Sequence, residues 1–108
     1  MYICHFGTNN LRSPKSADQI AREIVNIGLE IKTDQNEVVI SSITHRNDKL
    51  NAKGSDVNKL LKSLCNDYSL GFIDNGNIRR NHLNSSGLHL NMQGTAALAN
   101  NFLDYIDA

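Results

Sequence analysis

Short apolar runs alternate with amphipathic segments along this chain. Runs at 2–6, 37–43 and 71–74 are bounded by turn-forming residues and are rich in β-branched or aromatic side chains, which favours strands. Between and after these runs, apolar residues recur every three or four positions, which favours helices. The predicted order is strand, helix, strand, helix, strand, long loop, helix. Such alternation predicts an α/β fold in which a parallel sheet of about three strands is covered by helices.

The predicted helices have recognisable starts and apolar faces. Ser16 with Gln19 matches a capping box, and Pro14 precedes it. The apolar stripe that follows consists of Ile20, Ile24, Ile27 and Ile31. A polar loop at 44–54 leads to a second helix, for which Ser55 is the expected N-cap. The apolar positions of that helix are Val57, Leu60, Leu61, Leu64 and Tyr68, and those of the final helix are Leu98, Phe102 and Ile106.

Composition narrows the function classes. The 108 residues suffice for one domain with a single core. Lysine plus arginine and aspartate plus glutamate both number 11, so the chain lacks the basic excess of a nucleic-acid-binding protein. Arg79 and Arg80 with His82 form the nearest approach to a basic cluster, which is short enough to be a solvated loop. No nucleic-acid partner is therefore expected.

The chain shows no targeting or membrane pattern. The apolar run at 2–6 is too short for a signal peptide, and no apolar stretch is long enough to span a bilayer. Cys4 lies in an apolar run and Cys65 on the apolar side of a predicted helix, so we expect both to be buried, unpaired thiols in a reducing compartment. The expected localisation is cytoplasmic.

Two polar motifs follow predicted strands. Gly7-Thr8-Asn9-Asn10 leaves the first strand, and His89 follows the third strand after the long loop. In open α/β sheets, reactive groups lie in loops at the carboxyl ends of the strands. The side-chain amide of Asn9 is suited to donate to a developing oxyanion, and a loop histidine such as His89 is suited to act as a general base. Each motif alone is more typical of a turn or of a structural histidine.

In combination and in this order, the motifs resemble a known family. Residues 7–10, the stretch 43–48 leading into 57–61, and 87–90 followed by Gly94 are similar to the later signature blocks of SGNH (GDSL-type) hydrolases. Within that group, the chain most resembles the catalytic subunits of intracellular platelet-activating-factor acetylhydrolase. The resemblance implies a flavodoxin-like three-layer α/β/α sandwich. Residues 1–108 would then be the C-terminal portion of a single domain of this kind, with three strands that match the third, fourth and fifth of the family sheet.

The same resemblance implies roles for individual residues. Asn9 corresponds to the side-chain donor of the oxyanion hole and His89 to the general base. Ser86 stands where the family has an aspartate that orients the histidine, and a serine supplies at best a neutral hydrogen bond. The nucleophilic serine and the second-block glycine have no counterpart, because the segments that carry them would precede Met1. We therefore expect an esterase-like portion that is inactive alone.

No residue type in the chain replaces the missing nucleophile or adds a cofactor. There is no Gly-x-Ser-x-Gly elbow, and Gly54-Ser55-Asp56 opens a predicted helix instead of leaving a strand. The four histidines show no ligand pair at helical spacing, and there is no Cys-x-x-Cys motif, so neither a metal nor a cofactor is expected.

Two alternative functions stay open. One is a non-catalytic interaction module in which the sheet edge docks onto another protein. The other is a flavodoxin-like domain for a small ligand or nucleotide, although the chain lacks a glycine-rich phosphate loop. The expected partners are a small acyl-ester substrate, if a nucleophile segment is supplied, and a second copy of the chain through the edge strand at 2–6.

Overall fold

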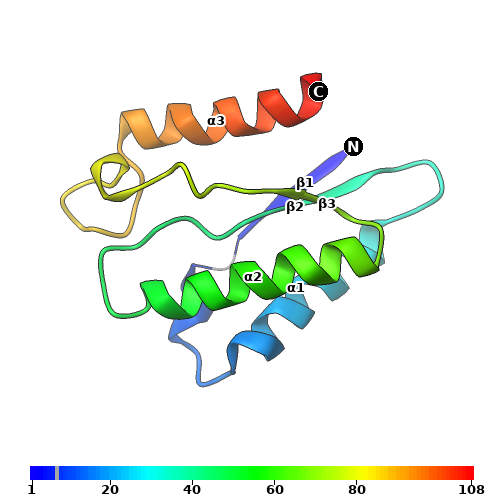
Figure 1. Cartoon of the computed structure of the whole chain (residues 1–108), viewed down its shortest axis with the longest axis horizontal. Coiled ribbons are helices and arrows are strands. Elements are labelled where there is room, and N and C mark those ends of the chain that lie inside the picture. The colour runs from blue at the N-terminus through cyan, green and yellow to red at the C-terminus, as the bar shows by residue number, and fades with distance from the viewer. Residues whose placement is uncertain (7) are drawn as a thin grey trace.

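The computed structural model describes residues 1–6 and 8–108 (Figure 1). Gly7, the first residue of the predicted 7–10 motif, lies outside the described residues. The strands are β1 (Tyr2–His5), β2 (Val38–Ser41) and β3 (Gly71–Ile73), and the α-helices are α1 (Ala17–Ile31), α2 (Asn51–Asp67) and α3 (Met92–Asp107). Short 3-10 helices, η1 (Asn9–Arg12) and η2 (Arg80–His82), follow the first and third strands. The predicted order of strands and helices is confirmed.

The strands form a parallel sheet in the order β1-β2-β3. Val39 of β2 lies opposite Ile3 of β1 on one side and Gly71 of β3 on the other. Each crossover passes through a helix, as parallel neighbours require. All four residues of β2 are buried, because this central strand has a neighbour on either side and helices against both faces. The predicted α/β class with a three-stranded parallel sheet is confirmed.

Helices cover the two faces of the sheet unequally. Figure 1 shows α1 and α2 side by side on one face and α3 crossing the other. The core lies between the sheet and the α1–α2 pair, and its fully buried members include Ile20, Val38, Ile40, Val57, Leu61 and Cys65. The loops that leave the three strands gather at one pole of the molecule, where all three helices also begin (left in Figure 1).

The start of α1 agrees with the prediction, but its buried stripe does not. The N–H of Gln19 donates to Ser16 Oγ at 3.1 Å, and the N–H of Ser16 donates to Gln19 Oε1 at 2.9 Å, which completes the capping box. Ile27, however, is 44% exposed, so the predicted isoleucine stripe is wrong at this position, whereas Ile31 is partly buried against the core. The contact face turns toward Gly28 instead, because this residue packs directly beneath the β2 side chain of Ile40.

The predicted N-cap of α2 at Ser55 is wrong, because the helix begins at Asn51 with Leu50 at the N-cap position. Asp48 Oδ1 accepts the N–H of Leu50 at 3.0 Å, which satisfies a donor just before the first turn. Gly54 is buried within the helix, where its missing side chain makes room for Leu11. At the other end, Tyr68 lies past the last helical residue and is 47% exposed, which corrects the expectation that it belongs to the apolar face.

Cys4 and the last helix are less buried than predicted. Tyr2 is 50% exposed and Cys4 is half-buried, because β1 pairs with β2 and has no second neighbour among the described residues. On α3, Leu98 and Phe102 are half-buried and Ile106 is exposed. Within residues 1–6 and 8–108, none of the helices is long and apolar enough to cross a bilayer.

Candidate functional site

A groove of about 360 Å³ lies where the loops after the three strands meet. The loop after β1, the loop after β2 and the long loop after β3 each contribute to its wall. We call it the His89 groove. Its polar lining residues are His5, Thr8, Asn9, Asn10, Thr44 and His89. Asn9 and His89, distant in the sequence, thus come to one groove, and both are exposed.

The backbone around Asn9 is held from both sides. Arg46 Nη1 donates to the carbonyl oxygen of Thr8 at 2.8 Å, directly before Asn9. On the other side, Lys53 Nζ donates to the carbonyl oxygens of Leu11 at 3.1 Å and of Ser13 at 3.0 Å. Leu11 is also fully buried beneath α2, which anchors η1 in the core. Asn9 therefore projects from a turn whose backbone has fixed contacts.

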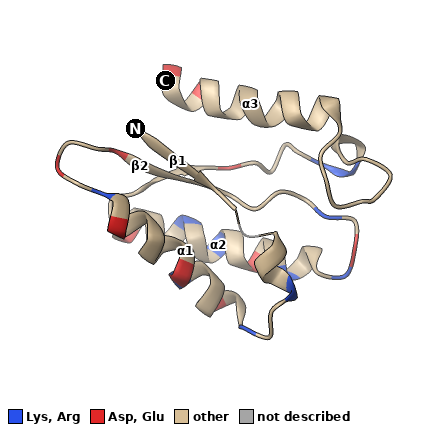
Figure 2. Ribbon diagram, turned by 180° about the vertical axis from the view of Figure 1, so that it is seen from behind, with Lys and Arg blue, Asp and Glu red and all other residues tan. Residues whose placement is uncertain are grey.

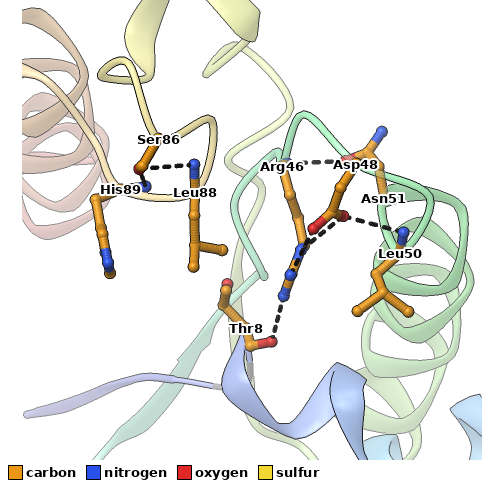
Figure 3. Close-up of polar contacts among 8 residues, drawn as sticks. All are labelled: Thr8, Arg46, Asp48, Leu50, Asn51, Ser86, Leu88 and His89. Atoms are coloured by element: carbon orange, nitrogen blue, oxygen red, sulfur yellow. Dashed lines mark hydrogen bonds and ion pairs between the residues drawn. The ribbon is translucent and has the colours of Figure 1, made fainter.

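Arg46 is a buried cation, and each of its three guanidinium nitrogens donates a hydrogen bond. Its exposed fraction is 2%, and its Nε and Nη2 donate to the two carboxylate oxygens of Asp48 at 2.9 and 2.7 Å (Figure 3). This bidentate pair compensates the charge that burial would otherwise disfavour. The hydrogen bonds from Arg46 lower the pKa of the Asp48 carboxyl group. The ion pair thus joins the loop after β2 to the loop that carries Asn9.

A tight turn presents His89. Gly87 has a φ of +70°, and a Cβ atom there would lie 3.0 Å from Cβ of Asn47. The backbone N–H of Asn47 donates to the carbonyl oxygen of Gly87 at 2.7 Å, which ties the turn to the loop after β2. The N–H of Asn84 donates to the carbonyl oxygen of His89 at 2.8 Å and closes the turn. A contact from the loop after β2 and a contact within the long loop itself therefore fix the backbone around His89.

Ser86 supports this turn but does not contact the imidazole of His89. Its hydroxyl donates to Asn84 Oδ1 and accepts the backbone N–H of Leu88 at 3.2 Å and of His89 at 3.4 Å. Figure 3 shows the His89 ring pointing away from Ser86. Among the hydrogen bonds of the described residues, none involves the His89 ring nitrogens, so its tautomer is not set by a neighbour. The Ser86 hydroxyl thus bonds the backbone of the turn and the Asn84 side chain.

The structure brings together a second histidine and a serine that sequence reasoning did not connect. His5 and Ser41 are register partners on β1 and β2, and His5 Nδ1 lies 2.8 Å from Ser41 Oγ. Ser41 Oγ also accepts a hydrogen bond from Asn75 Nδ2 at 2.7 Å. Burial lowers the pKa of His5, which favours the neutral imidazole, and the tautomer of that ring decides which of His5 Nδ1 and Ser41 Oγ donates. The pairing of His5 with Ser41 follows from the register of β1 and β2, and the hydropathy pattern of the sequence does not predict this register.

The His5–Ser41 pair is placed to support the sheet. Ser41 is only 2% exposed and does not line the His89 groove, so a substrate in that groove does not reach its hydroxyl. The His5 ring packs edge-on against Phe102 of α3, with ring centroids 6.1 Å apart. The pair therefore fastens β1 to β2 beneath α3. Thr8 and Thr44 are the hydroxyl-bearing residues of the groove lining described above.

Metal-ligating and thiol groups are dispersed. Within residues 1–6 and 8–108, no three His, Cys, Asp or Glu side chains lie close enough together to hold a metal ion. Cys4 and Cys65 are free thiols. Burial raises the pKa of Cys65 to about 11 and also raises that of Cys4. The polar groups that line the His89 groove are the amides of Asn9 and Asn10, the hydroxyls of Thr8 and Thr44, and the imidazoles of His5 and His89.

Comparison with known proteins identifies the fold. No protein-family model and no curated protein sequence matches the chain. A GDSL-like lipase from Bacteroides thetaiotaomicron VPI-5482 superposes with a TM-score of 0.81 at 12% identity, covering 97% of this chain and 60% of that protein. A member of the lipolytic protein G-D-S-L family from Veillonella parvula DSM 2008 superposes with a TM-score of 0.72 at 19% identity, covering 94% and 59%. The chain thus has the α/β fold of GDSL-like lipolytic proteins and spans about three fifths of the length of these two.

Proposed function

We propose that this chain carries the oxyanion-hole and general-base portion of an SGNH-type acyl-ester hydrolase. The observation that carries the proposal is that Asn9 and His89 line the same groove. Each is presented by a turn with fixed backbone contacts, which suits groups that must be positioned before a substrate arrives. The fold shared with GDSL-like lipolytic proteins supports the same chemistry.

The proposed roles follow from the chemistry of the two side chains. The Asn9 amide donates a hydrogen bond to the oxyanion that develops as the ester carbonyl becomes tetrahedral. The His89 imidazole accepts the proton of the attacking hydroxyl and then returns it to the leaving alcohol. Because Ser86 contacts the backbone and not the imidazole, His89 would act without the aspartate that usually fixes the tautomer.

The attacking hydroxyl comes, in this proposal, from a segment outside these 108 residues. No serine lines the His89 groove in the described part of the chain. The two lipolytic proteins of the same fold have about two fifths of their length without a counterpart here. We infer that the chain corresponds to the C-terminal portion of a domain similar to the platelet-activating-factor acetylhydrolase catalytic subunits, and that it is inactive alone. Its two free thiols support a reducing compartment such as the cytoplasm.

The test compares the isolated chain with the endogenous protein. The intact mass of the endogenous protein is measured, and both forms are assayed with p-nitrophenyl acetate. We expect the 108-residue chain to match the buffer rate. We expect turnover from the endogenous protein, either with a mass above 12.0 kDa or in complex with a second polypeptide. An endogenous protein of 12.0 kDa that has no partner and no esterase activity would overturn the proposal.

A second candidate function is an interaction module that docks through β1. This strand has one neighbour in the described sheet, Tyr2 is 50% exposed, and Tyr2–His5 includes neither the lysine nor the proline that commonly protect sheet edges. We expect the chain to form dimers at micromolar concentration in sedimentation equilibrium, and Tyr2→Lys to dissociate them. A monomeric wild-type chain under these conditions would rule out self-association through β1.

A further inference from the structure

A second groove, of about 500 Å³, lies between the loop after β2, the first turns of α2 and the loop after β3. Its volume falls in the usual range of small-molecule sites. We call it the Arg79 groove. Its polar and charged lining residues include His45, Asn51, Asn58, Asp74, Arg79 and Arg80. Neither Asn9 nor His89 belongs to it, so it is separate from the proposed ester site.

Charge is distributed unevenly along the strand axis although the chain is neutral. The loops at the carboxyl ends of the strands, 6–16, 42–50 and 74–91, hold six lysines and arginines against two aspartates, an excess of four positive charges. At the opposite pole, 32–37 and 104–108 hold one lysine against four acidic residues. Figure 2 shows blue segments gathered on the loops at the right and red segments mainly toward the left. The pole with the Arg79 groove therefore attracts anions.

The polar side chains of the groove divide into engaged and available groups. The Asn58 side chain bonds both the N–H and the carbonyl of Ile43, at 2.7 and 2.9 Å, and forms a fixed wall. Arg79 and Arg80 are exposed, and neither takes part in an ion pair within the described residues. Asp74 is the acidic residue of the lining, and its Oδ1 accepts the N–H of Gly76 at 2.8 Å. The available donors thus outnumber the one carboxylate.

We propose that the Arg79 groove binds a small oxyanion, a carboxylate or a phosphate group, through the guanidinium groups of Arg79 and Arg80 with His45 as a further donor. A guanidinium group matches the geometry of both anions with paired N–H donors. The volume of the groove leaves room for the remainder of a molecule that carries the anionic group.

The test follows backbone amide signals by NMR while inorganic phosphate is added to the chain, with sodium chloride at matched ionic strength as the reference. We expect saturable shifts at Asn47, Gly76 and Arg79, with a dissociation constant on the order of 1 mM, as a few charge-assisted hydrogen bonds would give. A second titration with succinate distinguishes the two classes of anion. The anion with the lower dissociation constant identifies the group, carboxylate or phosphate, that the groove favours.

Paired variants decide whether the groove itself binds. Arg79→Ala with Arg80→Ala should weaken phosphate binding at least about tenfold, the loss of roughly one charge-assisted contact. The matched control, Lys59→Ala with Lys62→Ala, removes two exposed cations of α2 that do not line the groove and should leave binding unchanged. Amide shifts that rise linearly with phosphate concentration and equal those in sodium chloride would overturn the proposal. So would an equal loss of phosphate affinity in the two double variants. Neither result changes the expected outcome of the esterase assay, because the two grooves have no lining residue in common.

Discussion

Arg46 donates a hydrogen bond of 2.8 Å from Nη1 to the backbone carbonyl of Thr8, the residue before Asn9. The other two nitrogens of the guanidinium, Nε and Nη2, donate to the carboxylate of Asp48. An ion pair between buried Arg46 and partly exposed Asp48 in one loop thereby holds the backbone of another loop. If Asn9 is an oxyanion-hole donor, Arg46 is the positioning residue that holds it in place.

Removing this cation should destabilise the protein. We expect Arg46→Met to lower the free energy of unfolding by about 2 kcal/mol, since the hydrogen bonds are lost while the partly exposed Asp48 carboxylate is rehydrated. Urea denaturation measures the change. The matched control is Arg22→Met, which removes an exposed pair with Asp18 on α1 and should have no measurable effect. Equal effects of the two substitutions would contradict the role assigned to Arg46.

The turn before His89 depends on a glycine. Gly87 has a φ of +70°, and a Cβ atom would approach Cβ of Asn47 to 3.0 Å. We therefore expect Gly87→Ala to cost about 1–2 kcal/mol of stability and to shift the amide signals of Leu88 and His89. Gly76→Ala serves as a control, because Gly76 does not have a positive φ and its added Cβ would meet the terminal oxygen of the Asp74 side chain, which can rotate away. Unchanged His89 signals in Gly87→Ala would show that the turn tolerates a side chain.

Pairing of His5 with Ser41 predicts a pH dependence of stability. Burial lowers the pKa of His5 in the folded protein below the ordinary value of 6.5, so the unfolded chain takes up a proton first as the pH falls. The free energy of unfolding should decrease as the pH drops below about 6.5 and level off beneath the folded-state pKa. His5→Gln should remove this part of the dependence. Identical pH profiles for the wild type and His5→Gln, measured by urea denaturation, would refute the assignment.

Thiol reactivity tests the packing of α2. With a pKa of about 11, Cys65 is almost entirely protonated at pH 8, and the thiolate is the reactive form. We expect Cys65 to resist iodoacetamide in the folded protein and to react within minutes in urea, as followed by mass spectrometry of the digested chain. Half-buried Cys4 should be modified faster than Cys65 in the folded state. Rapid native modification of Cys65 would mean that the α2 contact with the core is loose.

The hydropathy pattern predicted the architecture because most of the core is built from periodic apolar positions, as in α1 up to Ile24 and throughout β2. The predictions from this pattern fail where contacts between distant residues, and not the local sequence, decide where a helix starts or which side chain is buried. Ser55 has the chemistry of an N-cap, yet Asp48 bonds the N–H of Leu50 and the helix starts earlier. Likewise, nothing in the local sequence shows that a loop arginine such as Arg46 is buried, since its partners include a carbonyl 38 positions away.

The placement of the site residues was partly predictable for the same reason. Parallel strands bring their carboxyl ends to one edge, so motifs that follow β1 and β3 were expected to meet, and Asn9 and His89 line one groove. The direction of the Ser86 hydroxyl was not predictable, because it depends on the turn at Gly87 and on Asn84. The His5–Ser41 pair depends on strand register in the same way.

The central claim is that Asn9 and His89 act together in ester hydrolysis, and substitution in the active endogenous form tests it most directly. For p-nitrophenyl acetate, we predict that Asn9→Ala lowers kcat by about 10²–10³ with little change in KM, as expected for loss of one oxyanion donor. His89→Ala should reduce turnover to the buffer rate, while Asn26→Ala on the exposed side of α1 should leave both constants unchanged. Ester hydrolysis that persists in both Asn9→Ala and His89→Ala would contradict the claim.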